Sequence, residues 1–231
     1  MRFERNVVGA WVSAALVAAT FSLYGQTATQ PGVHPISGRR FADVMGADGA
    51  SWLDRPEREL EEEPERAIAI LAIKRGAVVA DIGAGSGYMT EKLSARVGQN
   101  GKVYAVDIQP EMLRLLGRRL TQRKITNVIP IQGDVDNPKL PLSTIDLELL
   151  VDVYHEFSAP QAMLRHLRDA LKPDGRLVLL EYRKEDPMIP IRIEHKMTVA
   201  EAKLEVEAEG FTLSKRNEAL PRQHVLVFTK R

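Results

Sequence analysis

The sequence predicts an α/β fold in which a doubly wound, mostly parallel sheet carries helices on both of its faces. Two observations support this fold class. From residue 77 onward, short apolar runs of strand length alternate with longer segments whose apolar residues recur every three or four positions. The final two apolar runs, 211–216 and 224–229, follow each other without a helix, which predicts an antiparallel hairpin at one edge of the sheet.

Each strand is expected where an apolar run is bounded by turn or helix signals. The seven predicted strands span 77–82, 102–107, 127–132, 145–151, 176–181, 211–216 and 224–229. The Lys-Pro-Asp-Gly segment at 172–175 predicts a turn before the fifth strand. Glu148 interrupts the apolar fourth strand, where a charge is costly unless it is paired.

Helices are expected between the strands, and local signals mark their ends. The first follows the glycine loop and stops at Gly98. Pro110 stands at the first position of the next helix. Capping-box patterns at 158–161 and 198–201 begin two more, the second ending at Gly210. The charged run 57–66 and the apolar run that follows it predict one helix with a solvated face.

The N-terminus differs in composition from the rest of the chain. After Arg5 no Asp, Glu, Lys or Arg occurs until Arg39, and residues 7–21 are rich in Ala and Val. This pattern predicts a signal peptide over 1–25 and an exported protein, periplasmic or secreted. The alternative is an uncleaved anchor that associates with the membrane through residues 6–25 and leaves the domain in the cytoplasm. Residues 26–56 are expected to form a linker and an N-terminal cap, and 57–231 the main domain.

The composition argues against several classes of function. The 231 residues include 32 Lys and Arg against 31 Asp and Glu, so the chain has no overall basic field and no nucleic-acid partner is expected. Cysteine is absent, which excludes disulfides, thiolate metal sites and a cysteine nucleophile. No His and Asp cluster with ligand spacing is apparent, so no metal site is expected.

A carboxylate stands at the end of each of the first five predicted strands. These residues are Asp81, Asp107, Asp134, Asp152 and Glu181. An acidic residue after one strand is commonly a helix cap or a turn former, but five at one edge of a sheet predict a cleft of negative potential. Ligands of open parallel sheets bind outside this edge.

The loop after the first strand narrows the choice of nucleotide ligand. Glycines stand at positions 83, 85 and 87, whereas a dinucleotide site requires G-x-G-x-x-G; Tyr88 occupies the position of the third glycine in that motif. The G-K-S/T of a P-loop is absent. Asp107 lies 24 residues after Gly83, at a distance where a carboxylate can accept hydrogen bonds from both hydroxyls of a ribose.

These motifs together resemble those of the class I S-adenosylmethionine-dependent methyltransferases. The matching segments are Asp-Ile-Gly-Ala-Gly-Ser-Gly at 81–87, Val-Tyr-Ala-Val-Asp at 103–107, Gly-Asp at 133–134 and Leu-Lys-Pro-Asp-Gly-Arg-Leu at 171–177. The resemblance covers about residues 60–231 and implies a seven-stranded sheet of order 3-2-1-4-5-7-6 with the last strand antiparallel. The segments 151–157 and 181–187 look like a bacterial branch with exported-looking N-termini.

The resemblance also implies S-adenosylmethionine as cofactor and a set of residues that bind it. The glycine loop would hold the methionine and ribose end, Asp107 the ribose hydroxyls, Ile108 the adenine face and Asp134 the adenine amino group. The full set of expected cofactor residues is Asp81, Gly83, Ala84, Gly85, Gly87, Tyr88, Asp107, Ile108, Asp134, Val135 and Asp152.

The acceptor is expected after the fourth strand, where the family places it. His155 is the candidate general base, because an imidazole titrates near neutral pH, and Tyr154 is a second candidate at the same site that more simply forms a pocket wall. His155 could equally bond backbone or cap the next helix. His195 and His224 are weaker candidates for the acceptor pocket, whereas His166 is expected to be solvated.

Two functions from different classes fit the sequence. The first is a methyltransferase that moves a methyl group by in-line displacement to an oxygen or nitrogen of a small-molecule acceptor. The alternative is a non-catalytic module that keeps the fold for a structural or assembly role in the cell envelope. A dinucleotide oxidoreductase fits less well because of Tyr88.

Overall fold

The structure is a computed structural model that describes Met1 and residues 32–231. The predicted signal peptide or anchor over 1–25, and the first part of the predicted linker, lie outside these described residues. In the described part of the chain, no helix is long and apolar enough to cross a membrane.

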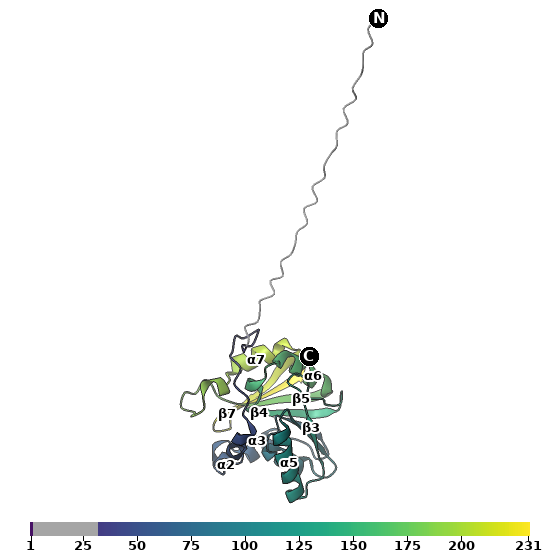
Figure 1. Ribbon diagram of the computed structural model, residues 1–231, viewed down its shortest axis with the longest axis vertical. Helices are drawn as coiled ribbons and strands as arrows, with labels where there is room; N and C mark the ends of the chain where they lie inside the picture. The colour runs from purple at the N-terminus through teal and green to yellow at the C-terminus, as the bar shows by residue number, and fades with distance from the viewer. Residues whose placement is uncertain (2–31) are drawn as a thin grey trace.

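A seven-stranded sheet forms the centre of the domain, with the order β3-β2-β1-β4-β5-β7-β6 (Figure 1). Neighbouring strands pair in parallel from β3 to β5, and β7 runs antiparallel to both β5 and β6. The predicted order and the predicted hairpin are therefore confirmed. The strands are β1 Val78–Ile82, β2 Lys102–Asp107, β3 Val128–Gln132, β4 Ile145–Val151, β5 Leu171–Tyr182, β6 Phe211–Asn217 and β7 Gln223–Lys230.

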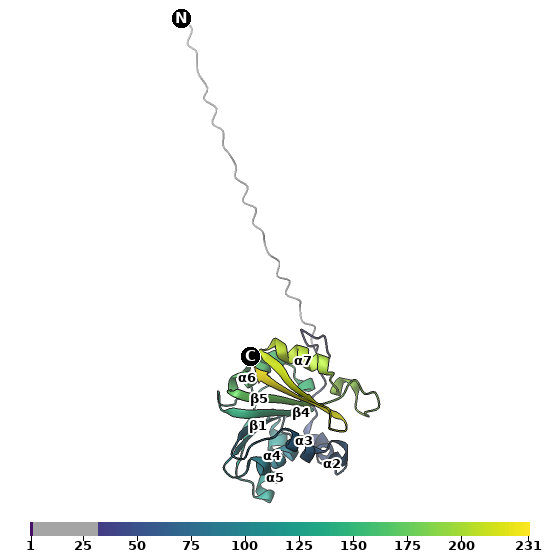
Figure 2. The same ribbon diagram turned by 180° about the vertical axis from the view of Figure 1, so that it is seen from behind.

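Helices cover both faces of the sheet, as Figures 1 and 2 show. α6 and α7 pack on one face through residues such as Leu164 and Val206, whereas α3, α4 and α5 lie on the other through Ile68, Leu93 and Leu116. The helices are α1 Ala50–Leu53, α2 Arg58–Glu61, α3 Pro64–Ile70, α4 Tyr88–Val97, α5 Pro110–Arg123, α6 Pro160–Ala170 and α7 Val199–Ala208, with short 3-10 turns η1 Ala47–Gly49, η2 Tyr154–Glu156 and η3 Ile193–His195.

The prediction of one solvated helix from 57 onward is wrong. The chain forms two helices, α2 and α3, because Glu63 adopts a left-handed conformation with φ 48° and Pro64 begins the second helix. The charged run is also not wholly solvated. Arg58 and Glu62 are buried and form an ion pair of 2.7 Å, and Tyr182 donates a hydrogen bond to Glu62.

Two further local predictions need correction, and one is confirmed. α6 begins after Ala159 without a side-chain cap, so Ser158 does not form the expected capping box. β5 begins at Leu171, and the expected turn at 172–175 is an irregularity within this strand. Thr198 and Glu201 do form a capping box at the start of α7, which ends at Ala208.

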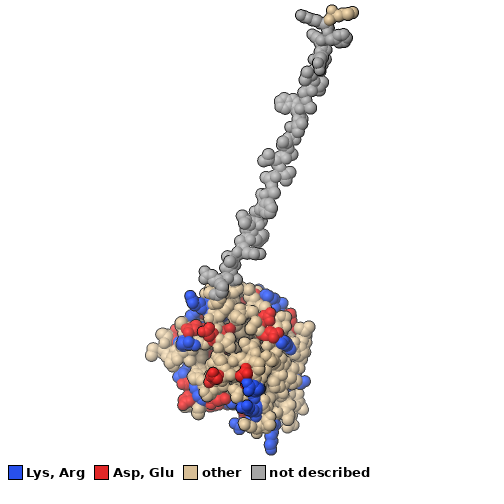
Figure 3. All heavy atoms as spheres, viewed as in Figure 1, with Lys and Arg blue, Asp and Glu red and all other residues tan. Residues whose placement is uncertain are grey.

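Five basic residues lie on α5 and at its C-terminal end, and their spacing in the sequence predicts a solvated outer helix face. Four of them are exposed, and the fifth, Arg119, is half-buried and pairs with Asp54 at 2.6 Å. In the view of Figure 3, acidic and basic side chains lie interspersed over the molecular surface. The exposed four are Arg114, Arg118, Arg123 and Lys124.

An ion pair ties the N-terminal segment to the domain. Arg39 donates two hydrogen bonds of 3.0 Å to the two carboxylate oxygens of Glu205 on α7, and a third to the carbonyl oxygen of His155. Both partners are buried, and His34 lies 3.5 Å from the same carboxylate. Removing one partner of such a buried pair typically costs about 3–5 kcal/mol. The segment around Arg39 is therefore held against α7 and η2 in the fold.

Glu148 lies in the middle of β4 and is fully buried. Neither carboxylate oxygen has a hydrogen-bond partner among the described residues. Burial raises the pKa of Glu148 well above its ordinary value of 4.5. Since the folded protein holds this proton more tightly than the unfolded chain, the contribution of Glu148 to stability falls as the pH rises above 4.5 toward the raised value.

The variant Glu148→Met is expected to stabilise the protein at alkaline pH. It removes a buried polar group without a partner, which is worth about 1–3 kcal/mol. Denaturant unfolding at pH 8 and at pH 4.5 measures the effect, and the gain over the natural protein should be larger at pH 8. A variant that is less stable than the natural protein at pH 8 would show that the carboxylate is paired in solution.

Candidate functional site: a pocket at the carboxyl edge of the sheet

The glycine loop between β1 and α4 brings backbone close to the carboxyl edge of the sheet. Gly83 and Gly85 have φ values of 72° and 54°, which side chains rarely tolerate. A Cβ atom on Gly83 would collide with Val153, and one on Gly85 would lie 2.9 Å from Leu53. Glycine is therefore required here by the backbone conformation and by the lack of space.

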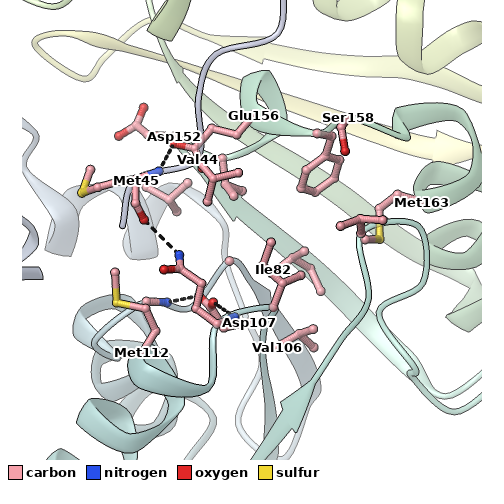
Figure 4. Close-up of a pocket in the computed structure, with 18 of the residues that line it drawn as sticks. Val44, Met45, Ile82, Val106, Asp107, Met112, Asp152, Glu156, Ser158 and Met163 are labelled. Atoms are coloured by element: carbon pink, nitrogen blue, oxygen red, sulfur yellow. Dashed lines mark hydrogen bonds between the residues drawn. The ribbon is translucent and has the colours of Figure 1, made fainter. Parts of the chain in front are cut away.

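Asp107 at the end of β2 holds two neighbouring loops. Its Oδ2 accepts a hydrogen bond of 2.9 Å from the backbone N–H of Gly85, and its Oδ1 accepts one of 2.8 Å from that of Gln109 (Figure 4). Burial raises the pKa of Asp107, and these N–H groups partly offset the effect. Each carboxylate oxygen keeps a further lone pair, so the group can also accept two hydrogen bonds from a vicinal diol.

A pocket opens beside Asp107 at the carboxyl edge of the sheet, where ligands of open parallel sheets bind. Its wall is mostly apolar, and part of it comes from the N-terminal segment (Figure 4). The apolar lining residues are Val44, Met45, Leu53, Ile82, Val106, Ile108, Met112, Val135, Val151, Val153, Phe157 and Met163.

Seven of the expected cofactor residues line this pocket. They are Gly83, Gly85, Asp107, Ile108, Asp134, Val135 and Asp152. The other four lie elsewhere. Asp81 is buried and accepts a hydrogen bond of 2.5 Å from Thr90, and burial raises its pKa to about 6. Tyr88 donates a hydrogen bond of 2.5 Å to Glu59, while Ala84 and Gly87 shape the loop behind the pocket wall.

Asp152 has an unusual conformation at the end of β4. Its φ is 50°, a region that costs free energy for a residue other than glycine. Gln223 donates a hydrogen bond of 2.6 Å to Oδ2, whereas the buried Oδ1 has no partner among the described residues. Burial raises the pKa of Asp152 well above its ordinary value. A buried acceptor beside the pocket fits a ligand that carries a cationic or N–H donor group.

The two expected catalytic residues do not line the pocket. Tyr154 is fully buried, packs edge-on against Phe157 and leaves its hydroxyl without a partner among the described residues. His155 is also buried; its Nδ1 lies 2.6 Å from Glu181 and its Nε2 lies 3.1 Å from Nδ1 of His195. A direct proton transfer from an acceptor in the pocket to His155 therefore has no support in this geometry.

Glu156 is the ionisable group that the sequence analysis missed at this end of the pocket. It lines the pocket, and its Oε1 accepts a hydrogen bond of 3.3 Å from the backbone N–H of Met45 (Figure 4). Burial raises the pKa of Glu156 to about 7. The sequence offered one signal that could have identified Glu156, since it is a carboxylate next to a histidine in the segment after the fourth strand.

The remaining histidines occupy separate environments. His195 belongs to η3 and reaches the pocket region only through His155 and Glu156, with which it forms a cluster whose ligand atoms all lie within 4.8 Å of one another. The sequence analysis did not identify this cluster, because His195 stands 40 residues away from His155 in the chain. His224 is buried between Glu185 and Glu218, and His166 is exposed as expected.

Parts of the chain are similar to known methyltransferases. Residues 79–175 match the methyltransferase domain family. The chain is 32% identical over 118 residues to the ubiquinone/menaquinone biosynthesis C-methyltransferase UbiE of Azotobacter vinelandii, covering 51% of this chain and 47% of the relative. The Escherichia fergusonii protein of the same name is 33% identical over 113 residues. The chain thus spans about half the length of the curated relatives it matches.

A solved structure shares most of the described fold. The crystal structure of a SAM-dependent methyltransferase from Aquifex aeolicus has a TM-score of 0.76 and 26% identity, and the match covers 80% of this chain and 98% of that one. Residues 79–175 are thus similar to a methyltransferase domain, and the chain shares its fold with a SAM-dependent methyltransferase.

Proposed function

We propose that the protein transfers a methyl group from S-adenosylmethionine to a small, uncharged, largely apolar acceptor, namely a hydroxylated aromatic ring. The observation that carries the proposal is the lining of the pocket. Among the described residues, no Lys, Arg or His lines it, whereas Asp107, Asp134, Asp152 and Glu156 do. A pocket with this charge disfavours acceptors that carry a carboxylate or phosphate, because no cation is present to pair with them.

The residues present fit the cofactor. Gly83 and Gly85 leave room for close approach, Asp107 can accept from the ribose hydroxyls, and the buried carboxylate of Asp152 suits the cationic methionine end. When bound, the cofactor supplies a methyl group that is already activated by a sulfonium. The protein then has to align the acceptor with that methyl group and exclude water.

The N-terminal segment supplies the exclusion of water. Met45 accepts a hydrogen bond of 2.9 Å from the side chain of Gln109 and donates one to Glu156, so it joins the segment to both sides of the pocket. Val44 and Leu53 complete the apolar wall on that side. The side chains with which this segment covers the pocket are therefore apolar and uncharged.

We extend the possible acceptor atoms from oxygen and nitrogen, which the sequence analysis expected, to carbon. The curated relatives in the comparison are named as C-methyltransferases of ubiquinone and menaquinone biosynthesis. A hydroxylated aromatic ring offers both an oxygen and an electron-rich ring carbon, and the apolar pocket wall is suited to contact with such a ring.

Loss of Asp107 is expected to remove cofactor binding. Hydrogen bonds to a charged group contribute about 1.5–3 kcal/mol each, so Asp107→Ala should weaken the binding of S-adenosylmethionine by at least about 100-fold in calorimetry. Asp174→Ala is the matched control, because Asp174 is exposed near the opposite edge of the sheet. Equal affinity of both variants would contradict the proposed binding mode.

Acceptor charge is expected to decide turnover. A panel of neutral phenols and hydroquinones, each paired with a carboxylated analogue, should be tested with radiolabelled S-adenosylmethionine. The neutral member of a pair should have at least about tenfold higher kcat/KM, since the pocket lining has no cation to pair with an acceptor carboxylate, and an unpaired charge there costs more than about 1.4 kcal/mol. Turnover restricted to the carboxylated analogues would overturn the proposed acceptor class, while leaving cofactor binding intact.

We also propose that residues 1–25 export the protein or anchor it in the membrane, on the basis of the uncharged segment 6–25. Mass spectrometry of the protein from fractionated cells tests this. A mature N-terminus after about residue 25 in the exported fraction supports cleavage, and an intact N-terminus in the membrane fraction supports the anchor. An intact chain in the soluble cytoplasmic fraction would contradict both.

A further inference from the structure

A cluster of metal-ligating side chains lies directly behind the pocket. His155 and Glu156 come from η2, which follows β4, and His195 comes from η3, 40 residues further along the chain. One ligand atom from each residue lies within 4.8 Å of the other two. We propose that these three side chains bind one divalent metal ion of the Zn²⁺ type.

The spacing of the two imidazoles fits a shared ion. Nε2 of His155 and Nδ1 of His195 lie 3.1 Å apart, and the ring planes are nearly perpendicular at 83°. Histidine nitrogens bind Zn²⁺ at about 2.0–2.1 Å, so two of them on one tetrahedral ion lie roughly 3.3 Å apart. Small side-chain movements would therefore suffice to admit the ion.

A buried carboxylate orients the first ligand. Glu181 at the end of β5 is fully buried; its Oε2 lies 2.6 Å from Nδ1 of His155, and its Oε1 accepts the backbone N–H of Tyr154. With Nδ1–H donated to Glu181, the lone pair of Nε2 points toward His195. Metal-binding histidines typically make such a second hydrogen bond, which fixes the tautomer and raises the basicity of the ligand nitrogen.

The third ligand connects the cluster to the pocket. Glu156 lines the pocket wall, while its carboxylate lies within reach of both imidazoles. Two nitrogens and one oxygen form a donor set that suits Zn²⁺ and related ions better than Mg²⁺ or Ca²⁺, which prefer oxygen ligands. Three protein ligands leave a fourth position for water or for an oxygen of a bound molecule.

Arg192 competes with the metal for His195. Its Nη2 lies 2.8 Å from Nε2 of His195, so in the metal-free protein Nδ1 of His195 carries the proton and donates it to His155. Metal binding at Nδ1 requires that proton to move to Nε2 and Arg192 to turn away. The side chain of Arg192 is 71% exposed, which makes this movement inexpensive.

The metal site would add chemistry to the proposed function. An acceptor hydroxyl in the fourth position would become more acidic through its bond to the metal, as water does on catalytic zinc ions. This consequence rests on the proposed function, whereas binding of the metal itself does not.

The test uses the full-length protein without an affinity tag, stripped with a chelator. Titration with Co²⁺, followed by visible absorption, and with Zn²⁺, followed by calorimetry, should give one equivalent bound. His195→Gln and Glu156→Gln should each weaken binding by at least about 100-fold, since each removes a ligand. Glu181→Gln should weaken it by about 10–100-fold, as expected for an outer hydrogen-bond partner. His166→Gln is the matched control and should bind as the natural protein does.

These measurements distinguish a metal site from a series of hydrogen bonds that binds no metal. Absence of saturable Co²⁺ and Zn²⁺ binding, or equal affinity of His195→Gln and His166→Gln, would overturn the proposal and leave a chain of hydrogen bonds from Arg192 to Glu181. Circular dichroism checks that each variant is folded. His195→Gln is the decisive variant, because His195 is only half-buried and its replacement should disturb the fold least. Cofactor binding by His195→Gln, measured in parallel, should be unaffected because His195 does not line the pocket, so a failure of the metal site is distinguishable from a failure of the proposed function.

Discussion

The carboxylate of Asp107 is the contact on which the functional end of the molecule depends. It stands at the end of β2 and accepts backbone N–H groups from both the glycine loop after β1 and the segment before α5. These two segments form adjacent walls of the pocket. The side chain of Asp107 fixes both segments and also faces the pocket. The same carboxylate therefore determines the shape of the site and its capacity to bind a diol.

The N-terminal segment converts this edge of the sheet into an enclosed site. Arg39 and Glu205 fasten the segment to α7, and Met45 then contacts both Gln109 and Glu156 across the pocket. Both members of this ion pair are buried, and loss of either one would leave an unpaired buried charge, so the cover is part of the folded domain. The pocket therefore depends on residues outside the part that matches the methyltransferase domain family, 79–175.

Much of the fold could be predicted from the sequence because its signals are local. β2 and β4 have the bounds that their apolar runs predicted, and Thr198 caps α7 as its pattern indicated. Long-range contacts could not be predicted in this way. The contact between His155 and His195 joins positions 40 residues apart. Arg58 is buried despite its place in a charged run, and its guanidinium lies over the ring of Tyr88 on α4. The glycine loop could be predicted because it is a local sequence motif. The burial of Glu156 could not, because it depends on contact with Met45, 111 residues earlier in the chain.

The central claim is that the cofactor binds at Asp107 beneath this cover. A crystal structure of the full-length protein with S-adenosylhomocysteine tests it most directly. The account predicts both ribose hydroxyls within hydrogen-bond distance of the two oxygens of Asp107, the sulfur directed toward the space between Met45 and Glu156, and the N-terminal segment in place. A ligand bound at another edge of the sheet, or a ribose that makes no contact with Asp107, would contradict it.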